Sequence, residues 1–283
     1  MSTNENKGKK AEVTALQAIS AEDRKDWISL AFVQAGICVC VPAFLLGALL
    51  AEAMPIWPAI ISGSLGYLIV VVGMVATGMI GCDLGLASCT CCQAGFGKSG
   101  ARFIVSTIFA VNMIGWFGIQ NGVCGEAFSN AMLAMTGWDI PVVVSNTIWG
   151  IIMLLTAVYG VHALEKLDKI SIPLLMIIMC YGTFLAFKVY GTGNLNDEGT
   201  VQSMSFMSGV ALSFNFTAVG TITGPDYTRF QKSRKDTVKS VFYGVFPMGV
   251  ITLIMGIVLT KLSGQYDICL LYTSPSPRDP KTS

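Results

Sequence analysis

The amino-acid sequence predicts an all-α polytopic membrane protein, because charge is scarce and long apolar stretches recur. Of the 283 residues, 53% are hydrophobic and 12% are charged, whereas a soluble domain carries roughly 25% charged residues. The uncharged stretches approach the roughly 20 residues that a helix needs to cross a hydrocarbon layer of about 30 Å. This composition argues against a soluble enzyme. A net charge of +1 also argues against a nucleic-acid partner, because such proteins concentrate a basic patch.

Hydropathy predicts seven membrane spans. We expect helices because an open sheet would leave backbone groups unpaired in lipid. The expected spans are residues 28–50, 57–80, 103–128, 140–161, 170–187, 203–222 and 240–260.

The connecting segments predict the orientation. Alternate connections are rich in basic residues, with Lys98 and Arg102 in one, Lys166 and Lys169 in another, and five lysines and arginines between 229 and 239. Residues 1–26 lack the apolar core and cleavage site of a signal peptide. Because Lys and Arg resist translocation, we expect the rich connections and this amino-terminal tail in the cytoplasm. The protein would then be a multi-pass protein of the inner (plasma) membrane.

Two of the spans contain residues that weaken helices. The first contains Gly36, Pro42 and Gly47, and the sixth contains Asn215, Gly220, Gly224 and Pro225. An ordinary kink is one interpretation, because Gly and Pro are common in membrane helices. Broken helices that line a cavity are the other. The first and sixth positions favour the second interpretation, because a five-helix inverted repeat places its broken helices there.

One face of the third span gathers polar and aromatic residues. Asn112, Trp116 and Gln120 stand four residues apart and share that face. The face could simply pack in the core, with an interhelical hydrogen bond. Alternatively it binds a ligand, because an indole stacks on a planar ring and a neighbouring amide both donates and accepts. Neutral planar amides or nucleobases would suit this pair.

Other polar residues give weaker signals. The group Cys89, Cys91 and Cys92 could bind a metal, but no second ligand pair completes a site, so helix packing is the favoured interpretation. Asp226 and Arg229, just after the sixth span, either form a gate ion pair or belong to a solvated loop. The single histidine leaves no catalytic set, so we expect no enzyme.

Three segments resemble one family of transporters. They are IGWFG at 114–118, GVHALEKLDKISIPLL at 160–175 and GTITGPDYTRF at 220–230. Over about residues 25–262 the chain is similar to the nucleobase and cation symporters, which include cytosine, purine, uracil, thiamine, allantoin and hydantoin permeases. Within that family the cytosine permeases are the most similar. The resemblance implies a leucine-transporter-like fold of about twelve helices, a five-plus-five inverted repeat of which the chain holds about the first seven.

The resemblance also implies a domain division. Residues 27–262 would be a partial transporter domain, with the first repeat and the start of the second. Residues 263–283 would be a truncated end. From about residue 268 the composition changes abruptly to Ser, Pro and charged residues, in the sequence CLLYTSPSPRDPKTS. It is similar to a translated sequencing adapter, so we expect it to be non-native.

The resemblance also implies, position by position, which residues bind the substrate and the sodium ion. Trp116 would stack on the substrate ring and Gln120 would hydrogen-bond it. Phe216 would close the other face of the ring, with Asn215 and Ala218 beside it. The remaining matches, all in the first span, are Cys40 as a substrate contact and Gly36 and Val39 as sodium ligands through their backbone carbonyls.

Two departures accompany these matches. Gln93 stands where the family usually has an arginine. The eighth helix, which holds the other sodium ligands and a base-reading asparagine, is absent, so we do not expect the chain as written to transport.

The sequence therefore predicts a secondary active transporter that imports a nucleobase with Na⁺ or H⁺ by alternating access. It would need no cofactor beyond the coupling ion and would work as a monomer in the lipid bilayer. Which base and which ion stay open. An amino-acid or other small-amine transporter of the same fold is the alternative. An intramembrane enzyme or accessory scaffold is disfavoured, because paired titratable groups are missing from the spans.

Overall fold

In the computed structural model the chain is helical. The structure describes residues 16–158, 161–192, 195 and 204–264, and within them there is no strand. The helices are α1 (Trp27–Cys38), α2 (Val41–Ala53), α3 (Ile56–Leu84), α4 (Ser88–Cys91), α5 (Gln93–Gly100), α6 (Ser106–Thr136), α7 (Val142–Val158), α8 (Val161–Tyr190), α9 (Phe206–Thr217), α10 (Val219–Thr228) and α11 (Arg234–Ser263). The amino-terminal tail before residue 16 and the end after residue 264 lie outside the described residues.

The seven expected spans all correspond to helices. Five helical segments are long and apolar enough to cross a membrane, and the bent pair α1 and α2 makes a sixth. Helix α7 is apolar but shorter. The expected loop before the third span is instead helical, because α5 and a π-helical turn, Ala101–Val105, lead directly into α6. Gly97, with φ of 68°, marks the kink in that segment.

The first span is broken, as predicted. Helix α1 ends at Cys38, and Cys40 is extended, with φ of −146° and ψ of 157°. Helix α2 then begins at Val41, bent by 52° from α1. Pro42 lies in its first turn. Backbone N–H groups in the first turn make no hydrogen bond within the helix, so a proline there costs none. The proline therefore starts α2 rather than kinking a continuous helix.

The sixth span is interrupted more gently. Ala218 separates α9 from α10 but keeps right-handed dihedrals, with φ of −55° and ψ of −31°. Helix α10 runs on to Thr228, so the helix continues past the expected end of the sixth span at residue 222 and Asp226 lies in its last turn. A membrane helix tolerates Pro225 because hydroxyl groups re-satisfy freed carbonyls. Pro225 leaves the Thr221 carbonyl without its helical donor, and the Thr77 hydroxyl on α3 donates to that carbonyl at 2.6 Å.

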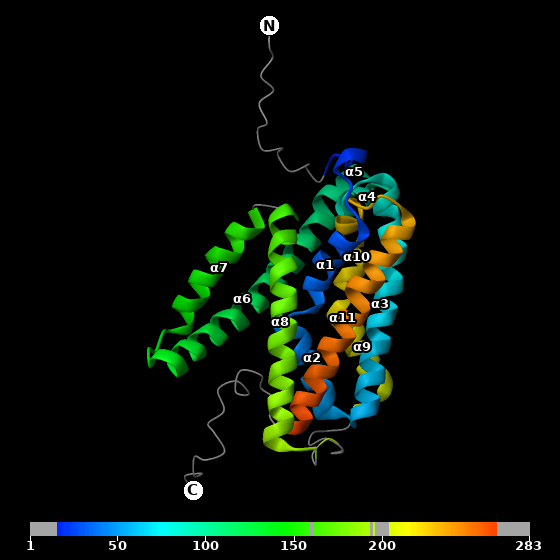
Figure 1. The fold of residues 1–283 in the computed structure, drawn as a ribbon. Coiled ribbons are helices and arrows are strands. Elements are labelled where there is room, and N and C mark those ends of the chain that lie inside the picture. Colours follow the sequence, from blue (N-terminus) through cyan, green and yellow to red (C-terminus); the bar gives the residue numbers. More distant parts are fainter. Residues whose placement is uncertain (1–15, 159–160, 193–194, 196–203, 265–283) are drawn as a thin grey trace.

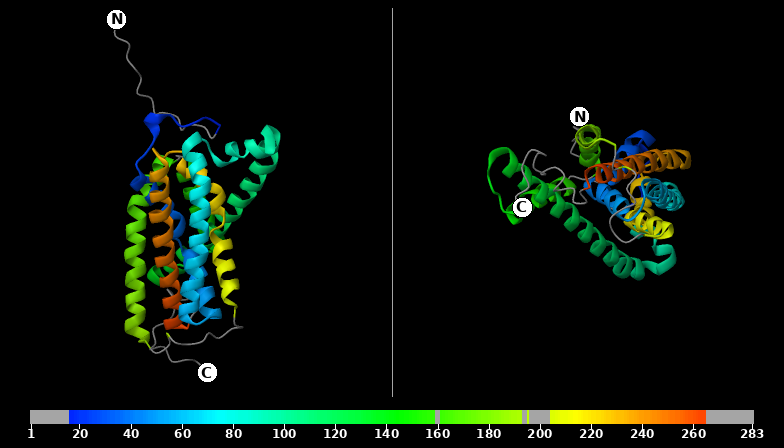
Figure 2. Two further views of the ribbon diagram at one scale, coloured as in Figure 1. Left: turned by 90° about the vertical axis from the view of Figure 1, so that its right-hand side faces the viewer. Right: turned by 90° about the horizontal axis from the view of Figure 1, so that it is seen from below.

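A tightly packed bundle forms the body of the molecule. Helices α3 and α11 run side by side, and α1, α2, α9 and α10 pack against them (Figures 1 and 2). Glycines permit the close approach: a Cβ on Gly256 would lie 2.5 Å from the Phe44 carbonyl oxygen, and one on Gly47 would lie 2.5 Å from that of Leu253. Small residues at helix contacts are the usual means of packing in membranes. We call α1, α2, α3, α9, α10 and α11 the bundle.

Helices α6 and α7 form an arm that leaves the bundle at an angle (Figure 1). They are joined to each other by two hydroxyl groups. Ser145 donates to the Gly125 carbonyl at 2.7 Å, and Ser129 donates to the Ile140 carbonyl at 2.6 Å. In α6 the buried residues are Gly125 and Ser129, so most of the arm has little protein around it. Helix α8 stands beside α1 and α11.

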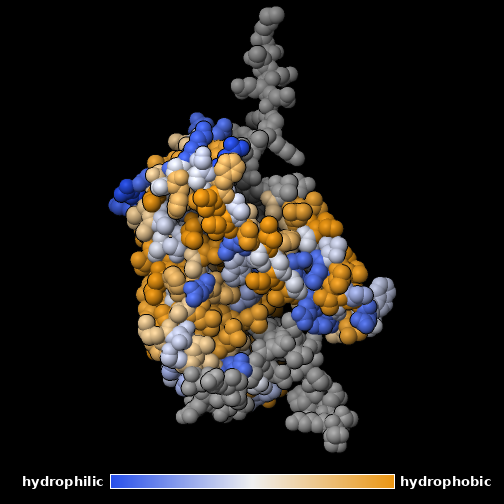
Figure 3. Space-filling model, turned by 180° about the vertical axis from the view of Figure 1, so that it is seen from behind, coloured by the Kyte–Doolittle hydropathy of each residue, from blue (hydrophilic) through white to orange (hydrophobic). Residues whose placement is uncertain are grey.

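One end of the bundle gathers the charged groups, and we call it the basic end. Arg234 binds both carboxylate oxygens of Asp83, at 2.9 and 3.0 Å from Nε. Lys232 pairs with Asp26, and Arg24 donates to the Gln231 carbonyl at 3.0 Å. Figure 3 shows hydrophilic residues at this upper end and a mostly hydrophobic flank below it. This distribution fits a molecule whose flank faces lipid.

Candidate functional site

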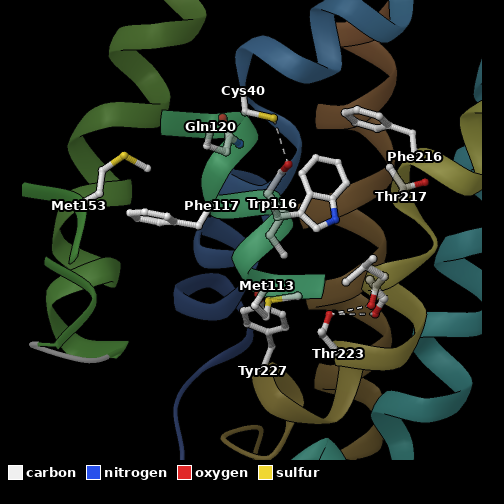
Figure 4. Close-up of a pocket in the computed structure, with 13 residues that line it drawn as sticks. Cys40, Met113, Trp116, Phe117, Gln120, Met153, Phe216, Thr217, Thr223 and Tyr227 are labelled. Atoms are coloured by element: carbon white, nitrogen blue, oxygen red, sulfur yellow. Dashed lines mark hydrogen bonds between the residues drawn. The ribbon is translucent and has the colours of Figure 1, made fainter. Parts of the chain in front are cut away.

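A cavity of about 320 Å³ lies where the broken first span meets the arm and helices α9 and α10. Figure 4 shows Trp116 in the middle of it, Cys40 and Gln120 on one side and Tyr227 on the opposite side. The lining is mostly apolar. It consists of Ile37, Cys40, Met113, Trp116, Phe117, Gln120, Met153, Phe216, Thr217, Val219, Gly220, Thr223 and Tyr227. An apolar pocket with a few polar groups is the usual form of a small-molecule site.

The local structure explains why these side chains meet. Trp116 and Gln120 are one turn apart on α6 and face the break. Cys40 is the extended residue of that break, and its thiol donates to the Ile37 carbonyl at 3.4 Å. Phe216 lies two residues before the α9–α10 interruption. The cavity therefore forms where two spans interrupt their regular helical backbone.

The two aromatic rings contact each other directly. The centroids of Trp116 and Phe216 lie 5.3 Å apart and the ring planes meet at 85°, an edge-to-face contact. A planar ring between them would need parallel rings about 7 Å apart, because each stacking contact requires about 3.5 Å between carbon atoms. In this arrangement the cavity cannot hold a sandwiched ring, and Phe216 would have to turn aside to admit one.

The structure brings together four of the seven substrate residues expected from the sequence: Trp116, Gln120, Phe216 and Cys40. Asn112 lines a neighbouring cavity of about 80 Å³ that shares Met113 and Val219 with the first.

Asn215 is exposed, and neither it nor Ala218 is among the lining residues. Sequence reasoning missed Thr223 and Tyr227. Their spacing of four residues on α10 was the available signal.

Gly36 and Val39 lie at the break, where the backbone suits a cation. Cys40 is extended, and the Ala43 N–H bonds to the Cys40 carbonyl. Within the described residues, neither the Gly36 nor the Val39 carbonyl therefore keeps its helical partner. Carbonyl oxygens of this kind are ligands for hard cations, so the two expected residues fit a sodium ion. The Asp168 carboxylate is close by, 3.1 Å from where a Cβ on Gly36 would lie.

The two expected gate residues make other contacts. The Asp226 carboxylate accepts from the Ser88 backbone N–H at 3.0 Å, and the Arg229 guanidinium lies over the Phe230 ring at 4.8 Å. The gate pair stays a prediction.

Nearby on α4 the Cys91 thiol donates to the Leu86 carbonyl at 3.5 Å, and burial is the main cause that raises its pKa. Within the described residues, no group of three His, Cys, Asp or Glu side chains is arranged to hold a metal ion.

Two solved structures share this fold. One is Mhp1, a nucleobase-cation-symport-1 family transporter, in a closed conformation with bromovinylhydantoin bound. Its TM-score is 0.82 at 18% sequence identity, over 92% of this chain and 61% of that chain. Mhp1 in an inward-facing conformation gives 0.75 at 17% identity, over 92% and 59% of the two chains. The expected leucine-transporter-like fold is thereby confirmed.

Curated relatives are permeases. The Escherichia coli K12 cytosine permease is 26% identical over 249 residues, which cover 87% of this chain and 57% of the relative. The Arabidopsis thaliana purine-uracil permease is 25% identical over 78% of this chain and 41% of its own length. The chain thus spans little more than half of the length of the cytosine permease.

A family model described as permease for cytosine/purines, uracil, thiamine and allantoin matches residues 19–276. That match covers most of the chain and includes both interrupted spans and the cavity between them. The chain therefore belongs to the family of permeases for cytosine, purines, uracil, thiamine and allantoin.

Proposed function

We propose that the protein imports a nucleobase, cytosine or a related purine or pyrimidine, by secondary active transport coupled to Na⁺ or H⁺. The observation that carries this proposal is the cavity in which the Trp116 indole and the Gln120 amide face the broken first span. An indole provides area for stacking a planar ring. An amide provides both a donor and an acceptor for the polar edge of a base.

The contact between the two rings suggests how binding and closure are linked. In the structure the rings of Trp116 and Phe216 pack edge to face against each other. A base that stacks on Trp116 would displace Phe216, which belongs to the interrupted sixth span. Substrate occupancy and the position of α9 would then depend on each other. Such coupling is what alternating access around a midplane site requires.

A bound cation would supply positive charge at the break. The Gly36 and Val39 carbonyls would hold it, and binding there would favour the conformation in which α1 stays unwound next to Cys40. For orientation, we propose that the basic end faces the cytoplasm, because Lys and Arg are retained on that side. We propose the monomer as the working unit.

The alternative is an amino-acid or other small-amine transporter of the same fold. Such a substrate would not need a stacking surface. Competition separates the two: unlabelled amino acids should fail to displace bound cytosine, and unlabelled nucleobases should succeed. Displacement by amino acids alone would favour the alternative.

Binding of tritiated cytosine to the purified chain in detergent tests the proposal. Trp116→Ala should weaken binding by roughly 5- to 150-fold, because stacking of a base on an aromatic ring is worth about 1–3 kcal/mol. Trp57→Ala is the matched control, since that indole is 70% exposed on α3, and it should bind as the unaltered chain does. Unchanged affinity in a folded Trp116→Ala variant would contradict the proposed role.

A further inference from the structure

The cavity has few polar groups that are available to a ligand. The Thr223 hydroxyl donates to the Val219 carbonyl at 3.0 Å, and the Thr217 hydroxyl donates to the Ser213 carbonyl at 3.0 Å. The Cys40 thiol donates to the Ile37 carbonyl. All three donors are therefore used within their own span, as is common for hydroxyls in membrane helices. They can accept from a ligand but cannot readily donate to it.

Tyr227 is different. Its side chain lines the cavity, and within the described part of the chain its hydroxyl has no hydrogen-bond partner. A phenolic hydroxyl both donates and accepts. The hydroxyl at the cavity wall is therefore available to a bound ligand that carries a polar atom within reach.

The position of Tyr227 complements that of Gln120. Figure 4 shows Gln120 and Cys40 on one side of Trp116, and Tyr227 on the other side, beneath Met113. A ring stacked on the Trp116 indole presents its edges outward in the plane of the stack. One edge would then face Gln120, and the opposite edge would face Tyr227.

We propose that the Tyr227 hydroxyl is a second hydrogen-bonding group for the substrate ring, at the end of the cavity opposite Gln120. It makes the site selective for planar rings that carry polar atoms on two opposite edges. This inference rests on the proposed function, because it assumes that a ring stacks on Trp116. It adds a side chain of α10 that can donate a hydrogen bond to the ligand, opposite the amide that α6 supplies.

Tyr227→Phe tests the inference, because it removes the hydroxyl and keeps the ring. Binding is measured to the purified chain for three ligands: cytosine, 2-pyrimidinone, which lacks the exocyclic amino group, and 4-aminopyrimidine, which lacks the carbonyl. The variant should bind cytosine about 3- to 10-fold more weakly, the effect of one hydrogen bond. For the ligand that lacks the atom facing Tyr227, the substitution should change nothing. Comparing affinities within one variant cancels any loss of folded protein.

Tyr181→Phe is the matched control, since this tyrosine is 62% exposed on α8, and it should leave all three affinities unchanged. Equal losses for all three ligands would mean a merely structural role for Tyr227 and would overturn the inference. Unchanged cytosine affinity in Tyr227→Phe would overturn it as well. In both cases Trp116→Ala would still weaken binding, so the proposed function would stand. If the unaltered chain bound none of the three rings, the proposed function and the inference would fall together.

Discussion

Glycines of the bundle and glycines along the middle of α6 differ in their surroundings, although Gly125, farther along α6, packs closely against Asn146 of α7. In the bundle, Gly47 and Gly256 lie where any side chain would overlap the backbone of the facing helix. In the arm, Gly115, Gly118 and Gly122 have open space around the position of a Cβ. The bundle is therefore held by close backbone contact, whereas α6 touches its neighbours at few points.

This difference bears on the site, because the cavity lies between the two regions. Trp116 and Gln120 come from the arm, and Cys40, Phe216 and Tyr227 come from the bundle. A shift of α6 against the bundle would change the width of the cavity and would leave the contact between α3 and α11 in place, because α6 packs mainly on α7. The close-packed part fixes the broken helix, and the loosely packed part supplies the stacking surface.

The sharpest test of this comparison is one substitution made in both regions. Gly256→Leu should cause the largest loss of stability of any change considered for this chain. Its Cβ would lie 2.5 Å from the Phe44 carbonyl oxygen, so α11 and α2 would have to separate. Overpacking of this kind typically costs about 1–3 kcal/mol and occasionally more. The melting temperature in detergent, followed by circular dichroism, measures it.

Gly118→Leu is the paired control on α6, where no atom lies within 4 Å of the added Cβ. It should melt close to the unaltered chain, and both variants gain the same helix propensity. Equal destabilisation by the two substitutions would mean that the arm is packed as closely as the bundle.

The sequence was sufficient to predict the break in the first span and the core of the site. Pro42 after Gly36 signalled the break, and the spacing of Trp116 and Gln120 placed both on one face of α6. Phe216 was added by its position in the resemblance to the family. These signals are local, within one helix or one motif, which is why they could be read without a structure.

The misplaced residues show what local signals miss. Successive residues on a helix point about 100° apart, so Asn215 faces outward although Phe216 next to it lines the cavity. Asn112 shares the face of Trp116 but lies one turn along the axis, about 6 Å away, in the neighbouring cavity. Tyr227 was missed because Pro225 and Asp226 lower the hydropathy where α10 in fact continues.

Hydroxyl groups that bond across helices should matter in the bundle, and hydroxyl groups that bond within one helix should not. Thr228 is fully buried and donates to the Gly78 carbonyl on α3 at 2.7 Å. Thr228→Val should destabilise the chain by about 0.6–1.7 kcal/mol, the range for hydrogen bonds between membrane helices. In the arm, Thr147 is exposed and donates to the Val143 carbonyl of its own helix at 2.8 Å.

Thr147→Val is therefore the matched control and should have almost no effect. Unfolding in mixed micelles with increasing dodecyl sulfate compares the two variants. If Thr147→Val cost as much as Thr228→Val, the loss would reflect the removal of any hydroxyl and not contact between helices.

The smallest effect is expected at the basic end, where the bundle meets water. Arg234 and Asp83 form a two-pronged ion pair, but their side chains are 66% and 39% exposed. Exposed pairs contribute little, because water screens them and two long side chains must be ordered. Arg234→Gln should therefore shift the melting temperature only slightly, and the shift should vanish in high salt, where the Debye length shortens. A large shift that persists in high salt would show that this end is held as firmly as the contact between α2 and α11, and the bundle would then resist separation along its whole length.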